Sequence, residues 1–278
     1  MDNYSVRVMN RQDMDLMIEW ARLENWNPGV NDAGCFHTAD PNGFFIGELD
    51  GEPIGCISAV KYSKDFGFIG FYLVRPEFRG KGYGIRLWRA GMEYLKGCDI
   101  GLDGVPSQQC NYQKSGFKLH YSNVRYMGVS EGWQPRYTES LDSIPFDDLL
   151  KYDTRIFGVQ RAAFLKAWIN QPDSFGCCSV EHEKVTGYGV LRLCDDGYKV
   201  GPLFADTPDV AQDILDSLLS NIGGSTFYLD VPEDNTGGMI IAEEYGMTPV
   251  FGTARMYTGI KHHVLVEHVF SVTSFELG

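Results

Sequence analysis

The sequence lacks several features that would assign it to a class at once. It has no run of 18 apolar residues, so no membrane-spanning helix is predicted. Its polar start, M-D-N-Y-S-V-R-V-M-N-R, contains no apolar stretch typical of a signal peptide. The seven cysteines are odd in number and follow no disulfide-framework spacing. Together these absences predict a cytoplasmic protein with reduced thiols.

Basic residues are also scarce, with 24 Lys and Arg against 37 Asp and Glu and a net charge of −13. This balance argues against a nucleic-acid-binding protein, which usually has a basic surface, and it is compatible with a cationic substrate such as an amine. His262, His263 and His268 form H-H-x-x-x-x-H, which is not an established metal-ligand spacing and has no cysteine beside it. We therefore expect no metal, nucleic-acid or membrane partner.

The 278 residues are enough for two domains, and the pattern of elements repeats once. The first part is predicted to contain strands 5–9, 44–49, 53–62, 66–74, 99–102 and 118–128, with helices 12–24, 32–37, 85–96 and 108–115. The second part is predicted to contain helix 159–170, strands 175–181, 186–193 and 198–205, helix 208–221, strand 226–231, helix 235–245 and strand 249–258, and the tail 262–278 adds one or two strands. We predict domains 1–129 and 146–278, a linker at 130–145, and an α/β (α+β) fold with a mostly antiparallel mixed sheet in each domain.

The stretch P-E-F-R-G-K-G-Y-G-I-R-L-W, residues 76–88, joins predicted strand 66–74 to the next helix. Gly80, Gly82 and Gly84 alternate there with charged and aromatic residues. Backbone N–H groups at a helix N-terminus bind anions, and glycines let a ligand approach the backbone closely. The turn therefore suits a phosphate or pyrophosphate, the alternative being a surface turn with glycines for geometry alone.

The turn is neither of two familiar nucleotide loops. A phosphate-binding P-loop needs G-x-x-x-x-G-K-[ST], and no Ser or Thr follows here. The dinucleotide fingerprint G-x-G-x-x-G would need glycine where Ile85 stands. Instead, Arg79-x-x-Gly82-x-Gly84 resembles the acyl-CoA pyrophosphate motif of the GNAT acetyltransferase superfamily. The preceding L-V-R-P at 73–76 and Y-Q-K-S-G-F at 112–117 strengthen the resemblance, which covers most of residues 5–128.

The resemblance implies an acetyl-CoA-dependent N-acetyltransferase in which an amine attacks the thioester directly within a ternary complex. It implies an oxyanion donor at a backbone N–H near Leu73 or Val74. Tyr112 matches the family's general acid, with a packing tyrosine as the alternative, and Gly70 is either a strand bulge that admits the pantetheine arm or a packing contact. One departure is that Val105 and Gln108 stand where many members use Asn and a small residue for pantetheine. The implied acetyl-CoA contacts are Leu73, Val74, Arg79, Gly80, Lys81, Gly82, Tyr83, Gly84 and Tyr112.

The acceptor site is less defined, because attack needs a neutral amine and the sequence does not identify the base. The candidate carboxylates are Asp103, at the end of predicted strand 99–102, and Asp32 and Glu24, which flank the N-W-N-P-G loop. Trp26 and Asn27 in that loop are candidate acceptor contacts. The alternatives are a solvated helix end for Glu24, a helix N-cap for Asp32 and a core position for Trp26.

The second half has L-F-A-D-T-P-D-V-A-Q-D where the first has its glycine turn, and Asp206 or Thr207 is a predicted N-cap before Pro208. The chain thus resembles tandem GNAT proteins with a degenerate C-terminal domain, which would cap the acceptor site. Arg155 and Arg161 are candidates for an acceptor carboxylate, or ordinary surface arginines. We expect acetyl transfer to a small-molecule primary amine by a monomer or homodimer. A non-catalytic acyl-CoA sensor and a protein N-acetyltransferase remain alternatives.

Overall fold

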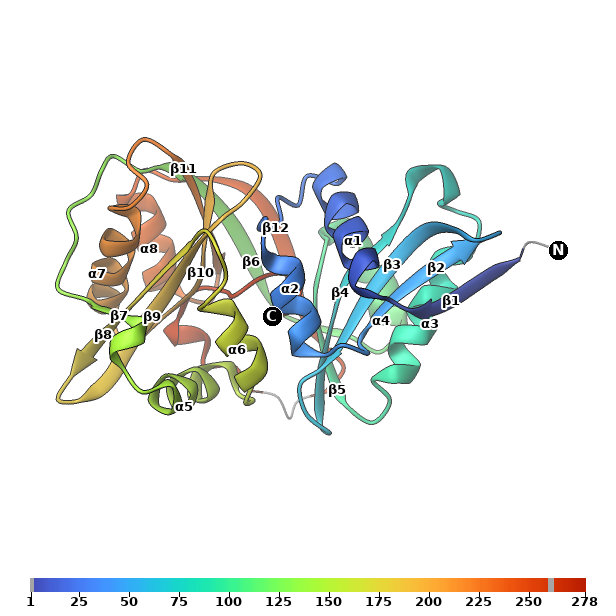
Figure 1. The fold of residues 1–278 in the computed structure, drawn as a ribbon, viewed down its shortest axis with the longest axis horizontal. Helices are drawn as coiled ribbons and strands as arrows, with labels where there is room; N and C mark the ends of the chain where they lie inside the picture. The colour runs from blue at the N-terminus through green and yellow to red at the C-terminus, as the bar shows by residue number, and fades with distance from the viewer. Residues whose placement is uncertain (1–2, 260–262) are drawn as a thin grey trace.

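The computed structural model describes residues 3–259 and 263–278, and within them the halves lie side by side (Figure 1). The first half contains β1 (Tyr4–Val8), α1 (Arg11–Leu23), α2 (Asp32–Ala39), β2 (Phe44–Leu49), β3 (Glu52–Lys61), β4 (Phe66–Val74), α3 (Tyr83–Tyr94), β5 (Asp99–Gly104), α4 (Gln109–Lys114) and β6 (Lys118–Val129). The second contains β7 (Glu139–Ser140), α5 (Phe146–Phe157), α6 (Ala162–Trp168), β8 (Ser174–Glu181), β9 (Lys184–Leu193), β10 (Tyr198–Ala205), α7 (Pro208–Leu219), β11 (Thr226–Pro232), α8 (Thr236–Glu244), β12 (Thr248–Tyr257) and β13 (Val269–Ser271).

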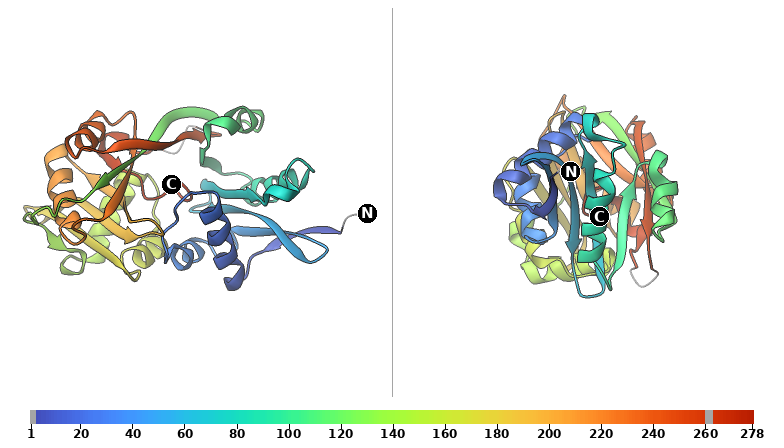
Figure 2. Two further views of the ribbon diagram at one scale, coloured as in Figure 1. Left: turned by 90° about the horizontal axis from the view of Figure 1, so that it is seen from above. Right: turned by 90° about the vertical axis from the view of Figure 1, so that its right-hand side faces the viewer.

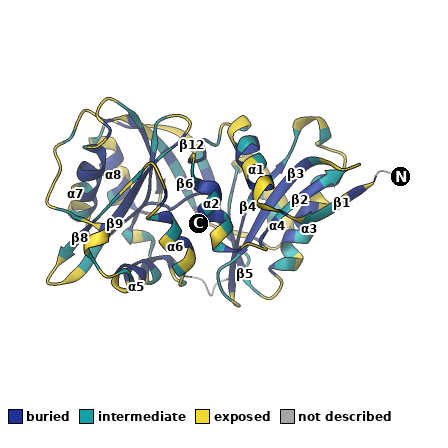
Figure 3. Ribbon diagram, viewed as in Figure 1, coloured by how far each residue is buried: buried dark blue, intermediate teal, exposed yellow. Residues whose placement is uncertain are grey.

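The described strands form one 13-stranded sheet in the order β1-β2-β3-β4-β5-β12-β6-β11-β10-β9-β8-β7, with β13 added against β10. Most neighbours are antiparallel, and β4–β5 and β10–β11 are parallel. This confirms the predicted mostly antiparallel mixed sheet and the repeated order of elements. The sheet is buried and the helices expose their outer faces, as Figure 3 shows.

The two halves exchange strands at the centre of the sheet. β12 of the second half lies between β5 and β6 of the first, and β6 in turn pairs with β11 of the second half. Figure 2 shows these long strands running from one half to the other. The predicted linker at residues 130–145 stays a prediction. The sheet is continuous from one half of the molecule to the other.

Apolar packing also joins the halves beside the sheet. Phe36 of α2 stacks on Trp168 of α6 with ring centroids 5.8 Å apart, and both side chains are fully buried. One hydrophobic cluster extends from Met14 of α1 to Leu165 of α6. The halves therefore share a core as well as a sheet.

Most predicted elements are confirmed, and the exceptions lie in the second half. The sequence pattern missed α5, and the predicted helix 159–170 is shorter, forming α6 after Gly158 ends α5 with φ +89°. Residue 262 lies outside the described residues, so the structure does not place His262. His263 is exposed, and the His268 Nδ1 lies 3.0 Å from the Ala205 carbonyl oxygen. Within the described ranges, no helix is long and apolar enough to cross a membrane.

Candidate active site

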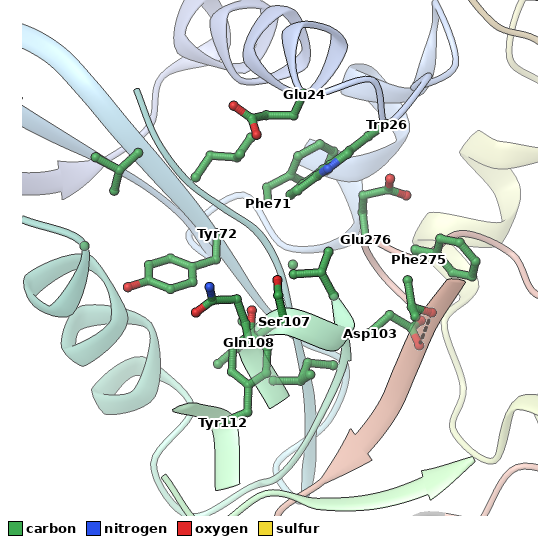
Figure 4. Close-up of a pocket in the computed structure, with 18 of the residues that line it drawn as sticks. Glu24, Trp26, Phe71, Tyr72, Asp103, Ser107, Gln108, Tyr112, Phe275 and Glu276 are labelled. Carbon is green, nitrogen blue, oxygen red and sulfur yellow. Dashed lines mark hydrogen bonds between the residues drawn. The ribbon is translucent and has the colours of Figure 1, made fainter. Parts of the chain in front are cut away.

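A pocket opens where β4 and β5 separate. The two strands pair in parallel from Phe66 and Asp99 up to Ile69 and Leu102. Beyond this point they part around a pocket of about 580 Å³, which we call the β4–β5 pocket (Figure 4). It is lined by Glu24, Trp26, Ile69, Gly70, Phe71, Tyr72, Leu73, Val74, Phe78, Arg79, Gly80, Gly82, Gly84, Ile85, Leu102, Asp103, Val105, Ser107, Gln108, Tyr112, Arg125, Phe251, Thr253, Phe275 and Glu276.

A bulge in β4 forms one wall of this pocket. Between the pairs Ser58–Gly70 and Cys56–Leu73, β4 has two residues where β3 has one. The first of these two, Phe71, has a φ of +43°, which a bulge can impose on a non-glycine residue. Gly70 lies next to the bulge, and a Cβ there would stand 2.0 Å from the carbonyl oxygen of Glu276. The bulge therefore lies beside Gly70 rather than at it, and the close approach of Glu276 fits the packing alternative, whereas a role in admitting the pantetheine arm stays a prediction.

The glycine turn lies at the mouth of the pocket. Gly80 and Gly82 have φ values of +74° and +88°, and Gly82 is the N-cap of α3. Because glycine has no capping side chain and the first turn of α3 holds no acid, the backbone N–H groups there are available to an anion. At Gly84 a Cβ would come within 2.8 Å of the Tyr72 hydroxyl oxygen. The turn keeps the geometry expected of an anion site.

Some charged and aromatic residues of the turn face elsewhere. Arg79 donates from Nε to the Val74 carbonyl oxygen at 2.7 Å and forms an ion pair with Glu24. Lys81 is exposed, with its ammonium 5.6 Å from the Phe78 ring centroid. Tyr83 is buried against Tyr4, with ring centroids 4.9 Å apart. Thus Arg79 lines the β4–β5 pocket, whereas the side chains of Lys81 and Tyr83 lie outside it.

Tyr112 comes from α4 and lines the same pocket as the turn. Its ring packs on Trp88 with centroids 5.5 Å apart. Burial, with Tyr72 nearby, raises the pKa of Tyr112 to about 12. The hydroxyl therefore keeps its proton near neutral pH and can donate it. Val105 and Gln108, the positions that depart from the family pattern, line the same pocket.

Asp103 lines the inner end of the pocket and is held by several donors. Arg255 of β12 donates to its two oxygens at 2.9 and 2.6 Å, and Asn123 donates at 2.8 Å. Burial raises the pKa of Asp103, and the charge and hydrogen bond of Arg255 oppose that rise. Asp103 is thus an ion-paired carboxylate at the pocket wall.

Of the predicted acceptor contacts in the N-W-N-P-G loop, Trp26 lines the pocket and Asn27 does not. Trp26 lines the pocket, and its carbonyl oxygen accepts hydrogen bonds from Arg125 and Lys199, each at 3.0 Å. Asn27 instead exchanges hydrogen bonds with the backbone of Asp196 in the second half. The structure places it outside the pocket lining.

Asp32 also lies outside the pocket lining. It is the first residue of α2, after the N-cap Asn31, and its side chain is buried. The carboxylate accepts from the backbone N–H of Gly29 at 2.9 Å and lies 3.5 Å from Arg192. Burial raises the pKa of Asp32, with Arg192 opposing the rise. Its contacts join the first half to β9 of the second.

Four pocket residues that the sequence predictions missed come from the second half of the chain. Phe251 and Thr253 come from β12, and Phe275 and Glu276 come from the segment after β13. Figure 4 shows Glu276 and Phe275 beside Asp103 and Trp26. Local patterns gave no signal for them, because they reach the pocket only through the strand exchange and the path of the tail.

The corresponding gap in the second half is occupied by the chain itself. β13 pairs with β10 through Leu203 and Ser271, and the Ser271 hydroxyl accepts from the backbone N–H of Asp230 on β11. α7 begins after Thr207, whose side chain accepts from Val210 N, as an N-cap should. The tail segment thus fills the place that is open between β4 and β5.

Arg155 and Arg161, the candidate contacts for an acceptor carboxylate, form ion pairs within the second half. Arg155 forms an ion pair with Asp206. Arg161 is fully buried and makes two hydrogen bonds to Asp153, at 2.9 and 2.8 Å. Neither arginine lines the β4–β5 pocket.

Two family models match the chain, one in each half. The model described as "Acetyltransferase (GNAT) family" matches residues 7–117, and the one described as "Acetyltransferase (GNAT) domain" matches residues 149–271. Among curated proteins, holothin acyltransferase of Pseudoalteromonas sp. (strain SANK 73390) is 32% identical over 96% of this chain and 92% of its own length. An uncharacterized N-acetyltransferase of Bacillus subtilis is 27% identical over 70% of this chain and 71% of its own.

Solved structures share the same fold. A crystal structure from Pyrococcus horikoshii, described as a candidate acetyltransferase, has a TM-score of 0.84 at 22% identity and covers 99% of this chain and 96% of that one. A tandem GNAT protein from the clavulanic acid biosynthesis pathway has a TM-score of 0.64 at 11% identity, covering 93% of this chain and 99% of that one. At these low identities, the similarity shows a shared fold.

Proposed function

This chain belongs to the GNAT acetyltransferase family, and we propose that it transfers an acetyl group from acetyl-CoA to a primary amine of a small molecule. The observation that carries the proposal is the gap between β4 and β5, which has the uncapped start of α3 at its mouth and the Tyr112 hydroxyl at its side. An acyl-CoA has an anionic pyrophosphate and a thin thioester arm, which match these two parts.

The proposed donor site uses the residues that line the pocket mouth. The pyrophosphate would accept hydrogen bonds from the backbone N–H groups of residues 80–85, where Gly80 and Gly82 leave the backbone uncovered. The arm would lie along Leu73 and Val74, where β4 no longer pairs with β5. Because β13 fills the equivalent gap in the second half, the proposal includes one donor site per chain.

The proposed reaction is direct attack in a ternary complex. The amine nitrogen attacks the thioester carbonyl carbon, the C–N bond forms and the C–S bond breaks. A backbone N–H near Leu73 or Val74 would stabilise the oxyanion, and the Tyr112 hydroxyl would give its proton to the departing thiolate. The Tyr112 hydroxyl, whose pKa is raised to about 12, carries its proton near neutral pH, as an ordinary tyrosine also does.

A small acceptor is supported by what covers the pocket. Phe251 and Thr253 of β12 and the tail residues Phe275 and Glu276 line it from the second half, so an extended peptide would have to displace part of the sheet or tail. A relative covering most of the chain is named holothin acyltransferase. Holothin is therefore the first acceptor to test, followed by a panel of primary amines.

Binding of acetyl-CoA is tested first, by calorimetry. Gly82→Trp should abolish binding because the ring would cover the start of α3. Gly97→Trp is the matched control: Gly97 also has a positive φ, +91°, and open space around it, but it lies in the turn between α3 and β5. The proposal fails if wild-type protein binds no acetyl-CoA, or if Gly82→Trp binds it as well as Gly97→Trp does.

Turnover separates the proposal from its alternatives. Release of free thiol from acetyl-CoA should depend on an added small amine. A non-catalytic acyl-CoA sensor would bind acetyl-CoA and release no thiol with any amine. A protein N-acetyltransferase would acetylate peptide amines, detected by mass spectrometry, in preference to the small amines.

A further inference from the structure

The segment from residue 272 to residue 278 leads from the closed gap of the second half into the open pocket of the first. Val272 donates its N–H to the Asp230 carbonyl oxygen at 2.9 Å, and Gly278 donates to the Ser274 carbonyl oxygen at 3.0 Å. Tyr62 donates its hydroxyl to the Leu277 carbonyl oxygen at 2.9 Å. With the Glu276 backbone also against Gly70, these contacts hold the backbone of the segment in place.

The Glu276 carboxylate differs from the other acids of the β4–β5 pocket. Asp103 is paired with Arg255, and Glu24 is paired with Arg79. Glu276 is only 7% exposed, lines the pocket, and has no hydrogen-bond or ion-pair partner among residues 3–259 and 263–278. A buried carboxylate without a partner is costly, so this one is suited to a ligand that brings a positive charge or donors.

The charged groups around Glu276 already have partners other than Glu276. Three carboxylates on neighbouring elements have arginine partners. Among the described residues, the Lys199 ammonium is another cation near Glu276, and it donates to the Trp26 carbonyl oxygen at 3.0 Å. Glu276 is left facing the pocket. The pairs are Asp32 of α2 with Arg192 of β9, Asp103 of β5 with Arg255 of β12, and Arg125 of β6 with Asp230 of β11.

Aromatic rings stand on both sides of this carboxylate. Trp26 and Phe71 have ring centroids 6.4 Å apart, and Phe251 and Phe275 have centroids 6.2 Å apart. All four side chains line the pocket, and Figure 4 shows Glu276 between Trp26 and Phe275. Flat apolar walls favour a flat apolar group. The Arg125 guanidinium already lies 5.7 and 4.8 Å from the Phe251 and Phe275 ring centroids, so these two rings interact with a cation of the protein itself.

We propose that Glu276 binds the amino group of the acceptor, and that the acceptor is a primary amine carried on an aromatic group. This inference rests on the proposed function, because it names the acceptor of the same site. The ammonium gives one proton to a Glu276 carboxylate oxygen, which passes it to solvent. The neutral nitrogen then forms the C–N bond as the C–S bond breaks, and it loses its second proton to solvent as the amide forms.

The test compares two probes that differ in charge, benzylamine and benzyl alcohol. Each is titrated by calorimetry into the protein, with and without saturating CoA. Wild-type protein should bind benzylamine about tenfold or more tightly than benzyl alcohol, as expected for a hydrogen bond to a charged group. Glu276→Gln should remove the difference. Glu267→Gln, which changes an exposed glutamate just before β13, should keep it.

The outcomes separate this inference from the proposed function. If acetyl-CoA does not bind, the proposed function fails, and the benzylamine preference of the CoA-free protein still tests Glu276. If wild-type protein has no such preference, or if Glu276→Gln retains it, the inference is overturned. A Glu276→Gln variant that unfolds more easily but retains the preference would show a structural charge only.

With an active acceptor, a kinetic readout follows. Glu276→Gln should lower kcat/KM for the amine about 100-fold, the usual order for removing a proton acceptor. The KM for acetyl-CoA should stay unchanged. Equal losses for donor and acceptor would indicate general damage to the pocket and would count against the inference.

Discussion

Gly70 provides a sharp test of how the tail reaches the β4–β5 pocket. A Cβ at this position would stand 2.0 Å from the Glu276 carbonyl oxygen, whereas ordinary contacts begin at 3.4 Å. In Gly70→Ala, the two backbones must therefore separate by about 1.4 Å, the difference between these distances. The Cβ position is fixed by the backbone of residue 70 and the Glu276 oxygen is a backbone atom, so no side-chain rotation can relieve the contact.

Two effects of Gly70→Ala should be measurable. Overpacking of this kind costs about 1–3 kcal/mol, so the urea midpoint of unfolding should fall. Displacing a reacting group by about 1 Å can lower turnover about 100-fold, so acetyl transfer should fall by this order. Acetyl-CoA affinity should change little, because the turn at residues 80–85 is untouched.

Gly34→Ala is the control for Gly70→Ala. Gly34 lies in α2, where a Cβ would be 3.9 Å from the Arg11 Nη2 atom, an ordinary contact. This variant should be as stable as wild-type protein or more stable by up to about 1 kcal/mol. If Gly70→Ala unfolds at the wild-type urea concentration and keeps full activity, the tail does not lie against β4 as described.

Three further predictions concern the pocket walls and the buried Lys199, which donates to the Trp26 carbonyl oxygen behind them. Tyr112→Phe should lower turnover about 100-fold and leave acetyl-CoA affinity intact, measured by thiol release and calorimetry; equal turnover would leave Tyr112 as a packing residue. Asp103→Asn should cost about 3–5 kcal/mol in urea unfolding because it leaves Arg255 buried without its partner charge, whereas Asp103→Leu combined with Arg255→Met should recover part of that loss. Burial and the nearby Arg125 lower the pKa of Lys199 to about 8 from 10.5, so between these values the unfolded chain binds a proton that the folded chain does not. Wild-type stability should accordingly gain roughly 3 kcal/mol from pH 7 to pH 10 from this group, and Lys199→Met should lack the gain in urea titrations at the two pH values.

Most helices and strands could be predicted from the sequence because the signals that define them lie within a few neighbouring residues. The apolar run that forms β4 (Phe66–Val74) and the pattern of β10 (Tyr198–Ala205) matched their predicted bounds. α5 was missed although its signals were present. It begins after Pro145 with two acids in its first turn, and Gly158 ends it.

The strand exchange could not be predicted in the same way. β12 has the same local pattern whether it pairs within its own half or with β5 and β6 of the other. Its pairing depends on which edges are free once both halves are built, a property of the assembled sheet. Because the two halves share an order of elements, each offers an equivalent place for the other's strand.

The same difference between local and long-range signals applies to the residues of the candidate site. The glycine turn and Tyr112 were found because their residues lie within short motifs. Asp103 was named as a candidate base, but its partner Arg255 is 152 residues away, so the ion pair was invisible in the sequence. Glu276 was missed for the same reason, since only the path of the tail brings it to β4.

The exchange of β6 and β12 also has a consequence for the order in which the chain is made. A ribosome that adds about 5–20 residues per second needs roughly 6–26 s to proceed from the end of β6 to the end of β12. Throughout that interval the nascent first half carries β5 and β6 without the strand that separates them. The residues that complete the pocket, Phe275 and Glu276, emerge later still. A chain interrupted during synthesis would therefore carry the whole glycine turn and still lack the acceptor side of the pocket.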